Sequence, residues 1–239
     1  MSRILKSLLL ASLALITACG RDAAPVIDPG DGGNYAFDLT PADFAAAIDN
    51  PYLPMAVGSR WVYEGSGERI EVEVLAETRL VMGITATVVH DAVTADGELI
   101  EDTYDWFAQD TAGNVWYLGE ASVEYQNGQP GSTAGSWEAG VDGALPGIVM
   151  PAQPAVGHAY RQEYYRGEAE DLAEIVRVGE ALTVPSGDYT DVMVTTEWTP
   201  LAPDTVEEKY YAAGVGMIKE MMIRGGSDSA VLVEYTPGG

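Results

Sequence analysis

Residues 69–74 read Arg-Ile-Glu-Val-Glu-Val, with an apolar side chain at every second position. Successive side chains of a β-strand point to opposite faces, so this stretch places Ile70, Val72 and Val74 on one face and its charges on the other. An amphipathic helix would instead repeat its apolar positions every three to four residues. The stretch therefore predicts a strand with one buried face.

Similar runs rich in Val, Thr, Tyr and Trp extend along the rest of the chain and favour strands for the same reason. They cover residues 81–90, 99–107, 114–118, 121–126, 160–165, 174–184, 189–198, 206–211, 217–223 and 230–235. Turn signals such as Asp96-Gly97 and Asn127-Gly128 separate many of them. Because no helical segments intervene, we expect a mostly β chain that forms a single curved antiparallel sheet, half-barrel or barrel-like.

One short helix is expected before the sheet begins. Thr40 is placed to cap it, Pro41 suits the first helical position, and Asp43 suits the positive first turn. The apolar run from Phe44 to Ile48 then continues the helix over residues 41–49, until Pro51 bars its continuation.

The charge balance excludes several classes of protein. Of 239 residues, 37 are acidic and 12 are basic, which gives a formal charge of −25. Nucleic acids and anionic membrane surfaces bind clustered Lys and Arg, so neither is an expected partner. The single Cys excludes an internal disulfide and a Cys-based zinc site, and two His residues argue against a multi-His metal site. No metal or cofactor is expected.

The first residues have the features of a secretory signal. Arg3 and Lys6 precede an apolar run from Leu8 to Ile16, which is too short to span a bilayer. The run ends in Ile16-Thr-Ala-Cys19, which resembles the lipobox of bacterial lipoproteins. That resemblance implies cleavage after residue 18 and lipidation of Cys19. In a bacterium with two membranes, Gly20 then implies an outer-membrane anchor facing the periplasm. The alternative is a plain signal peptide with a chance Cys.

The remaining chain divides into a tether and one folded unit. Residues 19–34 are rich in Gly, Pro and Asp and predict a flexible tether. Residues 35–239 are expected to form a single β-domain. The segment 133–154 contains many Gly and Pro residues but also Trp137, Leu145 and Ile148, so we interpret it as an ordered loop packed over an opening of the sheet. Two domains divided at this segment are the alternative.

Several strings resemble a group of uncharacterised bacterial secreted proteins and lipoproteins. They are NPYLP (50–54), GSRWVY (58–63), DWFAQD (105–110), GNVWY (113–117), GSWEAGVDG (135–143) and KYYA (209–212) followed by Gly214-Val-Gly216. More distantly, the run from Gly58 to Gly216 is similar to LolA-like envelope lipoproteins, whose sheet forms a half-barrel. The resemblance implies an envelope context and assigns no catalytic residues.

Two groups of side chains are candidates for a site. Glu138 and Asp142 lie beside Trp137 in segment 133–154, where paired carboxylates could act as general acid and base. The alternative is that both are solvated loop charges.

The second group comes from two strands with alternating polar residues. Glu163 and Tyr165 share a face with Arg161, and Lys209 and Tyr211 share a face with Glu207. These faces line a polar cavity if the sheet is a half-barrel, or form a charge ladder on the solvent side. The aromatic set of Tyr104, Trp106, Trp116, Tyr117 and Trp198 is interpreted mainly as core, with sugar or cation binding as the alternative.

These observations favour a lipid-anchored envelope protein that is a non-enzymatic ligand-binding or envelope-assembly module. Its expected partners are the membrane, through the N-terminal lipid, and a small apolar or cationic ligand. The alternative is an extracytoplasmic hydrolase that uses paired carboxylates.

The lipidation hypothesis predicts that Cys19→Ser abolishes lipid attachment and leaves the protein unprocessed or released from the membrane. One diacylglyceryl unit supplies two chains, which suffice for stable anchoring where one is marginal. Mass spectrometry of the mature N-terminus checks this. An unmodified N-terminal residue other than Cys19 would contradict the anchor.

Overall fold

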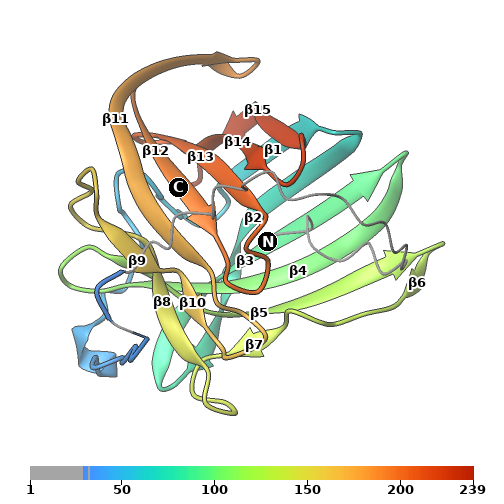
Figure 1. Cartoon of the computed structure of the whole chain (residues 1–239). Coiled ribbons are helices and arrows are strands. Elements are labelled where there is room, and N and C mark those ends of the chain that lie inside the picture. Colours follow the sequence, from blue (N-terminus) through green and yellow to red (C-terminus); the bar gives the residue numbers. More distant parts are fainter. Residues whose placement is uncertain (1–28, 32) are drawn as a thin grey trace, which may run out of the picture.

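The computed structural model describes residues 29–31 and 33–239 (Figure 1). The expected signal peptide, Cys19 and most of the expected tether lie outside the described residues. Asp31, near the end of the expected tether, forms an ion pair with Arg161 at 2.6 Å between Oδ2 and Nε. Within the described part of the chain, no helix is long and apolar enough to cross a membrane.

The described chain is 59% strand and 1% helical, and its strands form one antiparallel sheet. The strands are β1 (Arg60–Gly65), β2 (Glu68–Val81), β3 (Ile84–Ala95), β4 (Glu98–Gln109), β5 (Val115–Gln126), β6 (Gln129–Pro130), β7 (Trp137–Glu138), β8 (Leu145–Met150), β9 (Ala159–Arg161), β10 (Glu163–Tyr164), β11 (Leu172–Val184), β12 (Gly187–Trp198), β13 (Val206–Ala212), β14 (Gly216–Arg224) and β15 (Ser229–Thr236).

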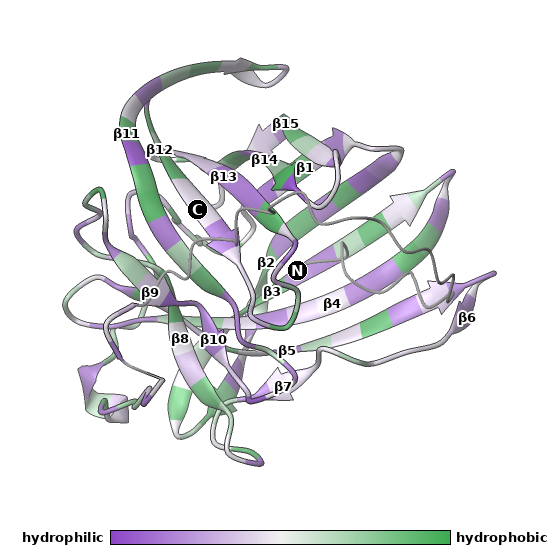
Figure 2. Cartoon of the chain, in the orientation of Figure 1, coloured by the Kyte–Doolittle hydropathy of each residue, from purple (hydrophilic) through white to green (hydrophobic). Residues whose placement is uncertain are grey.

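The order of strands in the sheet is β10-β8-β5-β4-β3-β2-β1-β15-β14-β13-β12-β11-β9, and β6 and β7 add to β5. The prediction of a single curved antiparallel sheet is confirmed. Hydrophilic and hydrophobic residues alternate along its strands, as Figure 2 shows. It is the same alternation, with a period of two residues, that is seen in the sequence of residues 69–74.

The two edges of the open sheet are neighbours in sequence. β9 ends at Arg161 and β10 begins at Glu163, so Gln162 alone joins one edge to the other. Gly147 of β8 lies against this residue, and a Cβ there would stand 2.3 Å from the Gln162 carbonyl carbon. Only glycine permits so close an approach of β8 to the link between the two edges.

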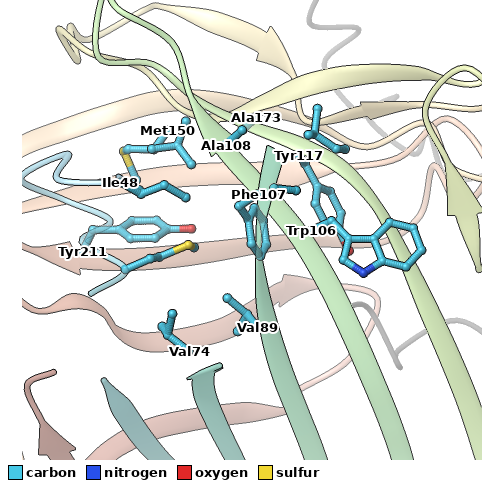
Figure 3. Close-up of a cluster of buried hydrophobic side chains, with 14 of the residues drawn as sticks. Ile48, Val74, Val89, Trp106, Phe107, Ala108, Tyr117, Met150, Ala173 and Tyr211 are labelled. Atoms are coloured by element: carbon cyan, nitrogen blue, oxygen red, sulfur yellow. The ribbon is translucent and has the colours of Figure 1, made fainter. Parts of the chain in front are cut away.

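The segment before β1 covers one end of the curved sheet. The Gln109 carbonyl oxygen Oε1 accepts hydrogen bonds from the backbone N–H groups of Asp49 and Asn50, at 3.0 and 2.9 Å. Asn50 Nδ2 donates to the Gly113 carbonyl at 2.9 Å. The fixed segment places Ile48 in the core, where it lies near Tyr211 and Met150 in Figure 3.

The helix expected over residues 41–49 is wrong beyond its first turn. Only Pro41–Asp43 forms a short 3-10 helix, η2, in which Asp43 Oδ2 accepts bonds from the Thr40 backbone N–H and hydroxyl, both at 2.7 Å. Phe44 then pairs with Asp110, and the Ala45 N–H donates to the Gln109 carbonyl at 2.8 Å. Pairing with the end of β4 thus replaces the helical hydrogen bonds.

Three of the expected strand boundaries also change. Met82 and Gly83, expected inside a strand, form the turn between β2 and β3 with φ of 52° and 80°. That places His90 within β3 rather than at a strand end. β5 runs continuously where two strands were expected, and its pairing with β4 shifts register at Gly119, which has φ of 136°. The expected strand 160–165 is divided at Gln162.

Segment 133–154 adds strands to the sheet. β7 pairs with β5 at Gly119 and Glu120, and β8 pairs with β5 between Val115 and Tyr117. Trp137 is 5% exposed, and its ring meets that of Tyr117 edge-on, with ring centroids 5.4 Å apart. The apolar residues of this segment therefore belong to the core around β5.

We predict that Trp137→Ala lowers the free energy of unfolding by about 3–5 kcal/mol, because removal of a fully buried Trp leaves a cavity. Urea denaturation measures this. Val141→Ala in the same segment is the control, because Val141 is 49% exposed. A change of less than about 0.5 kcal/mol is expected there. Equal effects of the two substitutions would contradict the packing of Trp137.

Candidate ligand-binding cavity

The concave face of the curved sheet lines an open cavity of about 600 Å³ among the described residues. Pockets for small ligands typically measure about 300–1,000 Å³. Strands from both halves of the sheet line the cavity, and Leu53 and Met55 of the segment before β1 contribute to it as well. The cavity is thus the space that the curvature of the sheet leaves between its inner side chains.

Much of the cavity lining is apolar. The apolar lining residues are Leu53, Met55, Trp61, Ile70, Val72, Val89, Val93, Phe107, Val149, Met217, Met221, Met222 and Ala230. Tyr63, Tyr117 and Tyr211 add aromatic rings. Figure 3 shows Phe107, Tyr117, Val89 and Tyr211 in the buried cluster that includes part of this lining.

The polar part of the lining is strongly acidic. Among the described residues, eleven carboxyl side chains line the cavity and Lys209 is the single basic one. The carboxyl residues are Glu68, Asp91, Glu101, Asp105, Glu124, Glu163, Asp171, Glu197, Glu207, Glu220 and Asp228. An organic cation therefore matches this lining in charge, whereas an anion does not.

Strand register explains how Lys209 comes to lie inside. Glu207, Lys209 and Tyr211 alternate along β13 and all face the cavity. β12 places Glu197 opposite Glu207, and β14 places Glu220 opposite Lys209. The polar face expected on residues 207–211 therefore lines the cavity rather than meeting solvent.

Lys209 is held by Glu197. Its Nζ lies 2.9 Å from Glu197 Oε2, and the Thr195 hydroxyl donates to Glu197 Oε1 at 2.8 Å. Burial alone would raise the pKa of Glu197, but Lys209 and the hydrogen bonds hold it below its ordinary value. Burial would lower the pKa of Lys209, but Glu197 and Glu207 raise it well above the ordinary value. The pair is therefore ionised, and Lys209 is not an amine poised for nucleophilic attack.

Asp91 and Asp105 form a different kind of site. Asp91 on β3 is 1% exposed, and neither of its carboxylate oxygens has a hydrogen-bond partner. Asp105 on β4 is also 1% exposed; Tyr117 donates to its Oδ1 at 2.5 Å, while its Oδ2 has no partner. Burial, reinforced by Asp105, raises the pKa of Asp91 well above its ordinary value. Burial and the charge of Glu120 raise the pKa of Asp105 to about 7, against the effect of the Tyr117 bond.

The structure brings three of the expected site residues to the cavity. Glu163, Lys209 and Tyr211 line it. Trp137 lies beside them in the core and donates from Nε1 to Glu163 Oε2 at 2.9 Å. Burial raises the pKa of Glu163 well above its ordinary value, and the charge of Asp171 adds to this.

The other expected site residues lie elsewhere. Glu138 binds Arg79, at 2.5 Å from its Oε2 to the Arg79 Nη2, and the Arg79 guanidinium lies 3.9 Å from the centroid of the Trp106 ring. Asp142 is an exposed turn residue with φ of 51°. Tyr165 pairs with Ala169 in a bridge at the end of the sheet. The structure therefore does not place Glu138 and Asp142 in the cavity with Glu163.

Sequence reasoning missed Asp91, Asp105, Glu197 and Glu220. A signal for two of them was present, because Asp91 falls between Val89 and Val93 in an apolar period, and Asp105 lies two residues before Phe107. An acidic residue at a position where the alternation predicts an apolar side chain indicates either a functional group or a strand face that is not buried. In the described residues, no group of three or more His, Cys, Asp or Glu side chains is arranged to hold a metal ion.

The raised pKa values predict that stability falls as the pH rises. Asp105 and Glu207 have pKa values raised to about 7, both chiefly by burial. A group with a raised folded-state pKa stabilises the fold below its unfolded pKa and loses that contribution as the pH rises through its folded pKa. The free energy of unfolding should therefore decrease between about pH 4 and pH 7, by about 1.4 kcal/mol per pH unit for each such group.

Urea denaturation at several pH values measures this slope. Asp105→Asn should make the slope shallower, because it removes one titrating group. Glu98→Gln, at an exposed position of the same strand, should leave it unchanged. Stability that rises between pH 5 and pH 8 would contradict the burial of these carboxyl groups.

No protein-family model matches the chain, and no curated protein matches it. Among solved structures, it is similar to a "putative exported protein with YmcC-like fold" from Bacteroides fragilis, with a TM-score of 0.45 and 13% identity over 78% of this chain and 99% of that chain. It is also similar to a "putative lipoprotein" from Parabacteroides distasonis, with a TM-score of 0.39, 13% identity and the same coverage of 78% and 99%. At this identity and these TM-scores, neither likeness identifies a family for this chain.

Proposed function

We propose that this protein is a lipid-anchored envelope protein that binds a ligand inside its curved sheet and does not act as an enzyme. The observation that carries the proposal is the cavity of about 600 Å³ with a lining that is both apolar and acidic. Such a lining offers apolar surface for affinity and a few polar groups for orientation, which is typical of small-molecule sites.

The envelope location rests on the sequence. Ile16-Thr-Ala-Cys19 follows a positive and then an apolar stretch, and Cys19 is the single Cys of the chain. In a bacterium with two membranes, the proposed anchor holds the sheet at the outer membrane, facing the periplasm. A flexible tether would then allow the domain to approach the membrane surface, where ligands enter or leave the bilayer.

Binding is favoured over hydrolysis by the placement of the charged groups. The paired carboxylates of segment 133–154, Glu138 and Asp142, lie apart from the cavity. Inside it, Lys209 is bound to Glu197. A hydrolase would need an acid, a base and a site for the attacking group that converge on one point.

The proposal predicts that the purified β-domain binds the neutral fluorescent probe N-phenyl-1-naphthylamine in its cavity. Val93 lines the cavity, so Val93→Trp should weaken binding about tenfold or more by filling the space. Fluorescence titration measures the affinity.

Ala92→Trp is the matched control, because Ala92 precedes Val93 on β3 and points to the other face of the sheet. It should leave probe binding unchanged. A ligand site in the cavity would be contradicted if the probe does not bind the unsubstituted β-domain. It would also be contradicted if the probe binds the Val93→Trp and Ala92→Trp variants with equal affinity. If the probe binds as expected, native mass spectrometry of protein purified from its own membranes identifies the natural ligand by its mass.

A further inference from the structure

We infer that the ligand is an amphipathic organic cation, an apolar chain or ring system with an ammonium group, and that Asp91 and Asp105 receive the ammonium. This inference rests on the proposed function, because it names the class of molecule that the same cavity takes.

The first observation is the state of Asp91. Its side chain is 1% exposed, lines the cavity, and has two carboxylate oxygens without a partner among the described residues. Buried polar groups are almost always hydrogen-bonded, because a buried acceptor without a donor loses its hydration and gains nothing in return, and the loss is largest for a charged group. A ligand that donates to Asp91 or neutralises it removes this cost.

The second observation is the set of charges around Asp91. On β3 it pairs with Val72 of β2 and Thr103 of β4. Asp105 and Glu101 lie two residues from Thr103 on either side, and their charges, together with that of Glu220 on β14, raise the pKa of Asp91. All three are carboxyl residues. Lys209, the one basic residue of the described lining, is bound to Glu197 instead.

The third observation is the aromatic and apolar surface next to these acids. Trp61 Nε1 donates to the Val215 carbonyl at 2.7 Å, and the Tyr63 hydroxyl donates to the Met217 carbonyl at 3.0 Å. Their polar atoms are thus satisfied, and their rings line the cavity together with Phe107. Aromatic faces attract organic ammonium groups, and the apolar lining accommodates the rest of an amphipathic molecule.

Other ligand classes fit less well. An anion would face the carboxyl groups with Lys209 already paired, and a neutral apolar molecule would leave Asp91 without a partner. A metal ion needs several oxygen ligands in one shell, and the described residues contain no such grouping. An organic ammonium group satisfies Asp91 while its apolar part covers the remaining wall.

The experiment compares three molecules with the same chain: decyltrimethylammonium, 1-decanol and decyl sulfate. Each competes with N-phenyl-1-naphthylamine for the purified β-domain, and the fluorescence decrease gives the affinity. We expect decyltrimethylammonium to bind about tenfold more tightly than 1-decanol, and decyl sulfate to bind most weakly. The quaternary ammonium does not titrate, so any pH dependence comes from the protein.

The site is tested with Asp91→Asn, which keeps the size of the side chain. It should reduce the affinity for decyltrimethylammonium about tenfold and leave probe and 1-decanol binding unchanged. Asp105→Asn, the second variant, should act in the same direction. The control is Asp102→Asn, because Asp102 contacts His90 at 2.6 Å and does not line the cavity.

A rise in affinity between pH 6 and pH 8 is a further expected result. Burial raises the pKa of Asp91 and Asp105, so the empty site carries protons that a bound cation displaces. Equal affinities for decyltrimethylammonium and 1-decanol, with the probe still bound, would overturn the cation inference and leave the proposed function standing. Loss of binding for all three molecules and the probe would overturn the proposed function itself. If Asp91→Asn and Asp105→Asn both keep the wild-type preference for decyltrimethylammonium over 1-decanol, these two residues do not receive the ammonium group.

Discussion

The interior of this protein depends on one close contact, that of Gly147 with Gln162. The contact packs β8, the neighbour of the edge strand β10, against the single residue that links β10 to the other edge strand, β9. A side chain at position 147 would collide with the Gln162 backbone and force β8 away from this link between the two edges. Because the sheet remains strongly curved, residues from strands as distant in its order as β3 and β14 line one space.

The curvature has an electrostatic cost. Period-two alternation turns one face of every strand inward, including Asp91, Glu163, Glu197 and Glu207. The fold offsets part of this cost with the ion pair of Glu197 and Lys209. It offsets another part by shifting carboxyl groups toward the neutral form, because burial raises the pKa of Glu207 to about 7. A cavity built only for stability would carry apolar residues at these positions.

The sequence predicted the sheet well, because local alternation decides which face of a strand is buried. It predicted boundaries less well. The turn at Met82-Gly83 carries no Asn or Asp. β7 has only two residues and β8 contains Pro146 and Gly147, so this segment suggested a packed loop. The helix over 41–49 failed because Phe44 and Ala45 pair with the end of β4, a contact that no local pattern encodes. The face containing Lys209 and Tyr211 was identified, but whether it met solvent or a cavity depended on how far the sheet curves.

The acid excess of the chain therefore divides into two populations with different physical effects. Acids on the outer face, such as Glu98, remain hydrated, and the simplest account of them is solubility. That account does not extend to Asp91, which is shielded from water and gains nothing from solvent screening. Carboxyl groups inside act on one another through a low-dielectric space, so each added negative charge raises the cost of the next. A fold retains such a group against that cost most readily when a partner of opposite charge enters the same space.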